Sequence, residues 1–471
     1  MSPATGGWAG LDADYSQWQR HEPSTELHWH PSTVAAKVAL AGVLLVVGVL
    51  TGRVELAGLA LPLLLTVAWG WSRRPRGFGS VTLAARLSSS AGEPGRLAGD
   101  ITWTPAPGVE GLQVRVSGPG HRPARALLAV PEPAAPGDDP ATRVVPVSIG
   151  SVRTGRRAVF LLDRVEVAPQ HVVEHTVVRR GPVELTVLPR ARSLREVPLP
   201  VRLQGLTGPH GSRRLGEGGD LHDVNLFGPG DRLRRIDWRV TTRRAAQTAR
   251  DGTIAELYVR RTFATADAAV MLVLDSRDDV GPDIGTWDDA SRVRESEPTS
   301  LDHARNAALT FARRYLDAGD RVGLEDLGRL HRPVAPAGGR RQLQRLTERI
   351  ARAEPEGEPK PRRRVPRLPS GALIMVFSTF LDDDAARFAT VWRTAGHRVV
   401  AVDVLPVLRT ARVSEQLEVA HRIIAMERAD RLGDLVAAGV ELVAWADDPR
   451  DPTALPVSAA TALLARRRVR R

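Results

Sequence analysis

Near its start the chain reads Val34-Ala-Ala-Lys-Val-Ala-Leu-Ala-Gly-Val-Leu-Leu-Val-Val-Gly-Val-Leu-Thr-Gly52 and, after Arg53, Val54-Glu-Leu-Ala-Gly-Leu-Ala-Leu-Pro-Leu-Leu-Leu-Thr-Val-Ala-Trp-Gly-Trp71. Each run approaches the ~20 residues that an α-helix needs to cross ~30 Å of hydrocarbon. Only a short turn around Arg53 separates the runs, so the two helices must be antiparallel. The sequence therefore predicts a transmembrane helical hairpin over residues 34–72.

The residues after the second run indicate how the hairpin is oriented. Trp69 and Trp71 stand where aromatic side chains meet the membrane interface, and Arg73, Arg74 and Arg76 follow directly. Positive charge stays on the cytoplasmic side of a membrane. We therefore expect both ends of a two-helix anchor, and the soluble domains, at the cytoplasmic face of the inner cell membrane. The spans show no polar relay for transport, and the alternative is a buried hairpin in a soluble protein.

Composition narrows the classes of function. The chain has no cysteine, which excludes a disulfide framework, a thiol nucleophile and a thiolate metal site. Its formal net charge of +12 comes almost entirely from arginine, a bias typical of a GC-rich genome, and aromatic residues make up only 4%. Both points argue against a nucleic-acid partner. The polar N-terminal segment, residues 1–33, is too long and too weakly basic for the start of a signal peptide.

The region 79–190 is predicted to be a β-rich, sandwich-like domain. Glycine and proline clusters separate short alternating runs, and short strands at this spacing are typical of a small β-sandwich. The runs suggest no catalytic constellation, so we expect a structural or interaction module. The predicted strands are Ser80–Leu87, Gly99–Trp103, Leu112–Val116, Ala126–Val130, Thr142–Ile149, Ala158–Val167 and Val183–Leu188.

The segment 205–261 alternates glycine, arginine and acidic residues without an apolar period. Side-chain hydrogen bonds must hold such a segment, and planar, bidentate arginine–carboxylate pairs are the expected means. We expect an ordered, salt-bridged loop with Trp238 packed beneath these pairs; the alternative is a surface that binds a partner or a phosphate. The candidate pairs combine Asp220, Asp223, Asp231 and Asp237 with Arg213, Arg214, Arg232, Arg234, Arg235 and Arg239.

Within this segment the chain reads Phe227-Gly-Pro-Gly-Asp-Arg-Leu-Arg-Arg-Ile-Asp-Trp238. This closely resembles the signature Phe-x-Pro-Gly-Asp-x-x-Arg-x-Ile-Asp-Trp of the domain-of-unknown-function-58 (DUF58) family. Leu221-His-Asp-Val and Thr242-Arg-Arg resemble its flanks, whereas Asn225 departs from the usual arginine. The residues that carry the resemblance are Phe227, Pro229, Gly230, Asp231, Arg234, Arg235, Ile236, Asp237, Trp238 and Arg243.

The resemblance extends over most of the chain and implies an architecture more than an activity. Members look like membrane-anchored proteins with a von Willebrand factor A-like domain, often encoded beside MoxR-type AAA+ ATPases and transglutaminase-like proteins. It therefore implies a protein partner, above all a MoxR-like AAA+ ATPase, and a role in protein-complex assembly or cell-envelope processes.

Residues 262–471 are predicted to form a doubly wound α/β domain of the von Willebrand A-like type. Continuous apolar runs alternate with amphipathic stretches, which is typical of parallel strands alternating with helices. The expected strands are 268–275, 321–327, 372–378, 398–405 and 440–445, and the expected helices are 301–318, 339–353, 382–395 and 429–438.

The first of these strands ends at Asp275, and such sheets bind ligands at the carboxyl ends of their strands. The resemblance implies a divalent metal held there by Asp-x-Ser-x-Ser plus a later Thr and Asp, oxygen ligands that suit Mg²⁺. This chain has Arg277 and Asp279 in place of the serines, and Thr379 where an Asp is usual, with Asp382 close by. Arg277 would repel a dication and could instead pair with Asp275 or Asp279. We expect a metal-free site and no cofactor, with Mg²⁺ at Asp275, Asp279, Thr379 and Asp382 as the alternative.

Three classes of function follow from these observations. The first is a membrane-anchored interaction scaffold that presents its soluble domains to a protein partner. The second is a metal-dependent, ligand-binding A-domain. The third is an uncharacterised hydrolase, which we do not expect because no Gly-x-Ser-x-Gly and no His-Glu-x-x-His motif occurs. Nothing in the sequence points to a small-molecule substrate.

Overall fold

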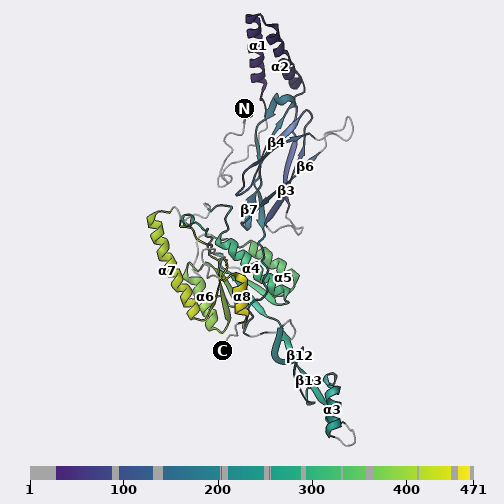
Figure 1. Cartoon of the computed structure of the whole chain (residues 1–471), viewed down its shortest axis with the longest axis vertical. Coiled ribbons are helices and arrows are strands. Elements are labelled where there is room, and N and C mark those ends of the chain that lie inside the picture. The colour runs from purple at the N-terminus through teal and green to yellow at the C-terminus, as the bar shows by residue number, and fades with distance from the viewer. Residues whose placement is uncertain are drawn as a thin grey trace. The chain divides into compact units, whose positions relative to one another are not determined.

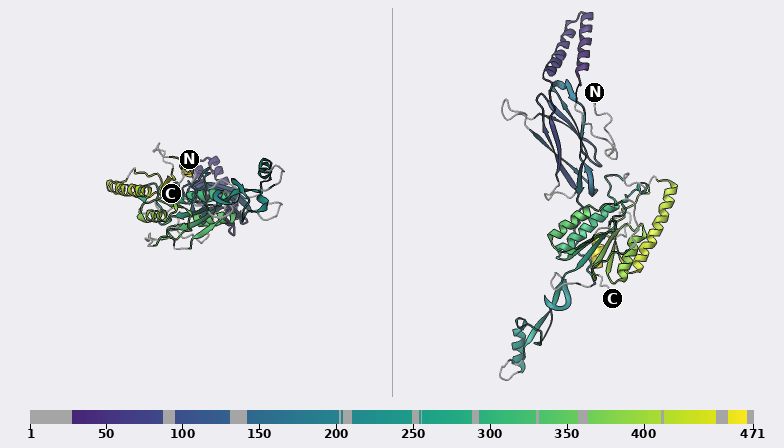
Figure 2. Two further views of the ribbon diagram at one scale, coloured as in Figure 1. Left: turned by 90° about the horizontal axis from the view of Figure 1, so that it is seen from below. Right: turned by 180° about the vertical axis from the view of Figure 1, so that it is seen from behind.

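The computed structural model of the chain divides into two compact units (Figure 1, Figure 2). One unit comprises Met1–Val187 with Arg294–Glu297, and the other comprises Leu188–Val293 with Pro298–Arg471. The polar segment predicted over residues 1–33 lies outside the described residues as far as residue 27. The structure describes residues 28–86, 95–130, 142–201, 203, 210–248, 254, 256–287, 293–329, 332–356, 364–410, 413–446 and 455–466.

The two predicted spans are helices that form a hairpin. α1 covers Val34–Thr51 and α2 covers Val54–Ser72. Both are long and apolar enough to cross a membrane, and only 11% of the most apolar 18-residue stretch of each helix is buried inside the protein. A Cβ atom on Gly48 would lie 2.8 Å from the backbone nitrogen of Ala57. The helices therefore approach as closely as small residues allow, and the predicted hairpin is confirmed as a pair of candidate membrane helices.

The start of α1 and the end of α2 contact a short turn in the strand-rich part of the same unit. The Thr33 hydroxyl, just before α1, donates to the His171 carbonyl at 2.7 Å. At the far end of α2, a Cβ atom on Gly70 would lie 2.3 Å from Cγ2 of Val172. Both helices therefore end against the short 3-10 turn Pro169–His171 and the residue after it.

Aromatic and basic side chains gather at the end of α2. The Arg73 guanidinium lies 4.0 Å from the Trp69 ring centre, and the Arg74 guanidinium lies 4.8 Å from the Trp71 ring centre. Arg76 is exposed. Stacked tryptophan and arginine side chains of this kind suit the boundary between apolar and aqueous surroundings.

The rest of the first unit is rich in strands. One sheet has the order β1-β9-β8-β4-β5 with β10 on β8, a second has the order β2-β3-β6, and β7 pairs with β11. The strands are β1 Trp29–Pro31, β2 Ser80–Arg86, β3 Arg96–Thr104, β4 Gly111–Ser117, β5 Ala124–Ala129, β6 Arg143–Gly150, β7 Gly155–Val159, β8 Leu161–Val167, β9 Val173–His175, β10 Val178–Arg180 and β11 Val183–Val187.

Side chains from two of these sheets share one core. Ile101 and Trp103 of β3 are buried together with Leu112 of β4 and Leu162 of β8. The prediction of a strand-rich region is confirmed, but the single strand expected over Ala158–Val167 is wrong. It is two strands, because Phe160 takes a positive φ of 24° and separates β7 from β8, which pair in different sheets.

The second unit is built on a six-stranded mixed sheet with the order β16-β15-β14-β17-β18-β19. All neighbours are parallel except β16, which is antiparallel to β15. The strands are β14 Ala269–Leu274, β15 Arg321–Asp326, β16 Val334–Ala337, β17 Leu373–Ser378, β18 Arg398–Asp403 and β19 Glu441–Ala444, and the helices are α4 Ser300–Asp317, α5 Arg340–Ala351, α6 Asp383–Thr394, α7 Glu415–Ala437 and α8 Val457–Arg466.

Helices cover both faces of this sheet, as Figure 1 shows. Alternate residues of β14 point to opposite faces: Leu272 and Leu274 pack with α4, α5 and α8, whereas Val273 packs with α6 and α7. A strand covered on both faces needs apolar residues at every position, and all six residues of β14 are buried. The predicted alternation of strands and helices is present, although α7 begins at Glu415, well before the predicted residue 429.

The second unit begins at Leu188, well before the predicted start of the α/β domain at residue 262. Leu194 and Val197 are buried in the core of the mixed sheet. The Tyr315 hydroxyl donates to the Pro198 carbonyl at 2.5 Å, and Arg398 Nη1 donates to the Leu199 carbonyl at 2.7 Å. The α/β unit therefore includes residues that the sequence analysis left between two predicted domains.

The segment predicted as a salt-bridged loop is instead a two-stranded ribbon with a helix at its tip, and we call it the arm. β12 (His210–Leu226) runs antiparallel to β13 (Tyr258–Ala266), with three register shifts along the pair. The short 3-10 helix Leu233–Arg235 and the helix α3 (Trp238–Thr248) lie between the two strands. The ribbon was missed because an isolated two-stranded ribbon need not bury either face, so its side chains show no alternation of apolar and polar residues.

Candidate functional site

The carboxyl ends of the parallel strands bring polar side chains together at one edge of the mixed sheet. Asp275 follows β14 directly, β15 ends at Asp326, β17 ends at Ser378 and β18 ends at Asp403. Pairing places Leu274 opposite Asp326, and Ser378 opposite Asp403. Because parallel strands share one direction, these side chains lie at the edge where α/β sheets bind ligands.

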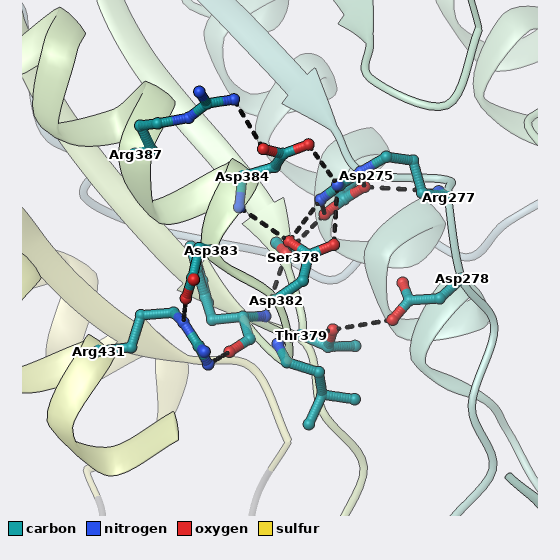
Figure 3. Close-up of polar contacts among 12 residues, drawn as sticks. Asp275, Arg277, Asp278, Ser378, Thr379, Asp382, Asp383, Asp384, Arg387 and Arg431 are labelled. Atoms are coloured by element: carbon teal, nitrogen blue, oxygen red, sulfur yellow. Dashed lines mark hydrogen bonds and ion pairs between the residues drawn. The ribbon is translucent and has the colours of Figure 1, made fainter. Parts of the chain in front are cut away.

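Arg277 occupies the centre of this edge (Figure 3). Its Nε and Nη2 donate to the two carboxylate oxygens of Asp275, both at 2.8 Å. The same guanidinium reaches Asp382, with Nη1 at 2.8 Å and Nη2 at 2.9 Å, and Nη1 lies 3.2 Å from Asp384. Asp275 and Arg277 are buried, whereas Asp382 is exposed at the mouth of the cluster. One arginine therefore links three carboxylates, from the loop after β14, the loop after β17 and the first turn of α6.

The electrostatics of the cluster follow from this arrangement. Burial alone would lower the pKa of Arg277, but the hydrogen bonds and charges of Asp275 and then Asp382 outweigh it and raise the pKa above its ordinary value. Arg277 is therefore a permanent cation. Its guanidinium lies within ion-pair distance of all three carboxylates.

Asp278, next to Arg277 in the chain, has a pKa close to neutrality. Burial raises its pKa to about 7, the charges of Asp275 and Asp382 add to the increase, and Arg277 and the Thr379 hydroxyl oppose it. The Thr379 hydroxyl lies 3.2 Å from Asp278 Oδ2. A carboxyl group in this position can hold or release a proton under physiological conditions.

The loop after β17 is fixed by hydrogen bonds from both sides. The Ser378 hydroxyl donates to Asp275 Oδ2 at 2.7 Å and accepts from the backbone N–H of Phe380 at 3.1 Å. Phe380 is fully buried and takes a left-handed φ of 53°. From α7, Arg428 donates to the Thr379 carbonyl at 2.8 Å, and Arg431 donates to the Phe380 carbonyl at 2.9 Å. The loop that carries the cluster is therefore preorganised.

The structure brings together only some of the predicted metal candidates. Asp275 and Asp382 meet through Arg277. Asp279 accepts a hydrogen bond from the backbone N–H of Leu301 in the first turn of α4, at 3.2 Å. The Thr379 hydroxyl donates to Asp278, which was not among the predicted metal ligands. Among the residues that the structure describes, no group of three or more histidine, cysteine, aspartate or glutamate side chains is arranged to hold a metal ion.

Several acidic residues of this edge were missed by the sequence analysis. They are Asp278, Asp326, Asp384 and Asp403. Asp326 accepts from the Ser276 hydroxyl at 2.5 Å, and Asp403 pairs with Arg428. Burial raises the pKa of both acids, although these partners oppose the increase. Asp326 and Asp403 could have been identified from the sequence, because each lies near the carboxyl end of a predicted strand.

The first half of the family signature forms the turn that follows β12. Asp231 accepts from the backbone N–H of Gly228 at 3.0 Å, and Gly230 takes a positive φ of 94°. Nη2 of Arg261, on β13, donates to Asp231 at 3.0 Å. That bond, with the Gly228 bond, lowers the pKa of Asp231. Phe227 and Pro229 complete this turn, which the ion pair fixes to the ribbon.

The second half of the signature starts α3. Asp237 accepts from the backbone N–H of Val240 at 3.1 Å, as residues at a helix N-terminus do. Ile236 forms a bridge to Val259 of β13. The buried Thr241 accepts from the backbone N–H of Tyr258 through its hydroxyl, at 3.0 Å. The signature residues Arg234, Trp238 and Arg243 are exposed, as are Pro229 and Gly230 of the turn, and Arg235 is half-buried.

Two expectations for the signature are wrong. Asp231 pairs with Arg261, which was not among the predicted partners, because the antiparallel ribbon brings β13 beside the turn. Trp238 does not pack beneath ion pairs, since 58% of its surface is exposed. Of the other predicted acids, Asp223 contacts His222 at 3.2 Å. The side chains of residues 211–220, which include the predicted Asp220, Arg213 and Arg214, lie outside the described part.

The signature turn, the ribbon and the acidic edge fall within one stretch of sequence. Residues 223–407 match the family described as Protein of unknown function DUF58. The match runs from the outer part of β12 to just beyond β18. It supports the resemblance noted above over a narrower range, without the hairpin and the strand-rich region. No curated protein shows a significant match to the chain.

The DUF58 region thus holds two distinct polar features. The strand-end cluster pairs each of Asp275, Asp382 and Asp384 with Arg277, so every one of these three acids has an ion-pair partner while the carboxylates outnumber the guanidinium. The arm carries the signature and exposes Trp238 among arginines. The first feature is an edge fixed by ion pairs, and the second is an exposed surface with apolar and basic side chains.

Proposed function

We propose that the protein is a membrane-anchored interaction scaffold whose DUF58 region docks a protein partner at the cytoplasmic face of the membrane. The observation that carries the proposal is the strand-end cluster, in which one guanidinium holds three carboxylates together. Arg277 fills the position where such a sheet takes its ligand, with its guanidinium on Asp275 and Asp382. The edge therefore offers a fixed surface, while the two apolar helices supply attachment to a bilayer.

The partner that fits the family resemblance is a MoxR-like AAA+ ATPase, and the α/β unit is proposed to be of the von Willebrand A-like type. Support for the fold comes from the parallel order β15-β14-β17-β18-β19 with helices on both faces. Support for the orientation comes from Arg73, Arg74 and Arg76, because cytoplasmic flanks carry the excess of positive charge.

Photo-crosslinking in the native host tests the scaffold proposal. A photoreactive residue is placed at exposed positions of the second unit in the full-length protein, and crosslinked partners are identified after detergent extraction. We expect a specific AAA+ ATPase, captured less efficiently when α1 and α2 are replaced by an unrelated two-helix anchor of opposite orientation. Failure to capture any protein at every position, with the chain present at its native level in the membrane, would argue against a scaffold.

A further inference from the structure

The outer end of the arm exposes large apolar side chains beside arginines. Leu233 is 70% exposed and Trp238 is 58% exposed. Arg239 and Arg243, one helical turn apart on α3, are also exposed. We refer to Leu233, Trp238, Arg239 and Arg243 as the tip surface.

The tip surface is held in place by the opposite side of α3. Thr241 is fully buried, and its hydroxyl accepts from the backbone N–H of Tyr258 on β13 at 3.0 Å. The backbone N–H of Asp237 donates to the Tyr258 carbonyl at 2.8 Å, and the Asp237 carboxylate caps the helix. The helix is therefore seated on the ribbon by these contacts, and the tip surface is presented outward without a need for ordering on binding.

The charge of the tip is strongly positive. Residues 227–248 contain six arginines and two aspartates, a formal charge of +4 as the difference of these counts. Asp231 is engaged by Arg261, and Asp237 caps α3. Both acids of this stretch are therefore used within the arm. Arg239 and Arg243 place two of these positive charges at exposed positions of α3.

We infer that the tip surface docks an acidic segment of a partner protein, an inference that rests on the proposed scaffold function and specifies its contact surface. Carboxylates of the partner bind Arg239 and Arg243 through the planar guanidinium groups. An apolar side chain of the partner covers Trp238 and Leu233. Tryptophan and arginine are the residue types that dominate binding energy at protein interfaces.

A protein segment fits this surface better than a lipid headgroup layer does. Helices that lie in a membrane interface present a continuous apolar face. The outward side of α3 instead carries Thr242, Arg243, Ala246 and Gln247 after Trp238, and Ala246 is the one apolar side chain among these four. Leu233 and Trp238, which both have arginines next to them in the sequence, suit a partner segment that carries acidic and apolar side chains.

The test uses the detergent-solubilised full chain and three fluorescent peptides. The first repeats Glu-Glu-Leu-Phe, the second has Gln in place of Glu, and the third has Ser in place of Leu and Phe. Binding is followed by fluorescence anisotropy. The tip variant is Arg239→Glu with Arg243→Glu, and the matched control is Arg341→Glu with Arg345→Glu, two exposed arginines with the same spacing on α5. Trp238→Ala tests the apolar anchor separately, and far-ultraviolet circular dichroism checks the fold of each variant.

We expect the Glu-Glu-Leu-Phe peptide to bind at least tenfold more tightly than either of the other peptides. The tip variant and Trp238→Ala should each weaken this binding at least tenfold, while the α5 variant changes it less than threefold. Equal binding of the Gln peptide, or equal loss in the α5 variant, would overturn the inference. So would tip-dependent flotation with phosphatidylglycerol vesicles without peptide binding, which would make the tip a lipid site. Partner capture through another surface would leave the scaffold standing while this inference fails.

Discussion

Arg277 folds back onto Asp275, two residues earlier in the chain, and its Nε and Nη2 reach both carboxylate oxygens at 2.8 Å. The pair is buried, and the same guanidinium extends to Asp382 and Asp384 on the loop and helix that follow β17. A local turn after one strand is thereby joined to the end of its neighbour. The strength of this joint, its relation to metal binding and its dependence on pH can each be measured.

Loss of the guanidinium should destabilise the α/β unit strongly. Arg277→Ala leaves the buried Asp275 carboxylate without its cation, and breaking a buried pair by removing one partner costs about 3–5 kcal/mol. The measurement is urea unfolding of the solubilised full chain, followed at the second unit by hydrogen exchange. Arg387→Ala is the control, because Arg387 pairs with Asp384 at the surface and such pairs contribute ~0–1 kcal/mol. Equal losses in both variants would contradict the role given to Arg277.

Replacing the internal cation by a hydroxyl should create affinity for a dication. In Arg277→Ser the carboxylates of Asp275, Asp382 and Asp384 lose their shared guanidinium, and oxygen ligands of this kind suit Mg²⁺ and Mn²⁺. We expect Mg²⁺ or Mn²⁺ to raise the thermal unfolding temperature of this variant, and Asp275→Ala in the same background to abolish the increase. A metal-dependent increase in the unaltered protein that Asp275→Ala removes would show that Arg277 does not exclude the ion.

Asp278 should make stability fall as pH rises toward neutrality. Its pKa is about 7 in the folded protein, against ~3.9 for an unperturbed aspartate. Between these values the folded state holds a proton that the unfolded state has released, so its contribution is complete below pH ~4 and is lost as pH rises through about 7. Asp278→Asn should therefore flatten the dependence and unfold at higher urea than the unaltered protein at pH 8.

The control for this measurement is Asp317→Asn, at an exposed end of α4 where the side chain is 63% accessible and contacts Arg313. The difference in urea midpoint between Asp317→Asn and the unaltered protein should be the same at pH 5 and at pH 8. If Asp278→Asn also shifts the midpoint equally at both values, Asp278 does not carry the proton in the folded state.

The membrane hairpin can be mapped with single cysteines because the chain has none of its own. Arg53→Cys lies in the turn between α1 and α2, and Arg96→Cys lies at the exposed start of β3. If the helices cross the bilayer twice, a membrane-impermeant maleimide should label only Arg53→Cys in spheroplasts. It should label only Arg96→Cys in inverted vesicles. Labelling of both positions from the same side would show that the helices do not span.

The sequence predicted the elements whose side chains repeat with a clear period. The mixed sheet is an example, since β14 and β17 are buried on both faces and read as continuous apolar runs. The early part of α7 was missed because Leu435 is its one buried residue among those described, so the helix has no apolar stripe to recognise. β1, β9 and β10 have three residues each, too few for any alternation to stand out.

The same limit applies to the candidate site. Asp275 and Asp382 could be placed near each other because each follows a predicted strand. The contact of Asp384 with Arg277 depends on the first turn of α6, and the contact of Arg428 with the Thr379 carbonyl depends on where α7 crosses the sheet edge. Neither follows from spacing, because they arise from packing between elements far apart in the chain.

The arm meets the α/β unit at one end of its ribbon, where His210 Nε2 lies 2.9 Å from Asp320 Oδ1. His210 pairs with Ala266 at one end, and Leu226 pairs with Tyr258 at the other, where the signature begins. Everything between Leu226 and Tyr258 can therefore vary in sequence or length while the mixed sheet keeps the same register and core. For protein engineering, this makes the arm a separable insertion, which can be exchanged for another sequence while the α/β unit stays the same.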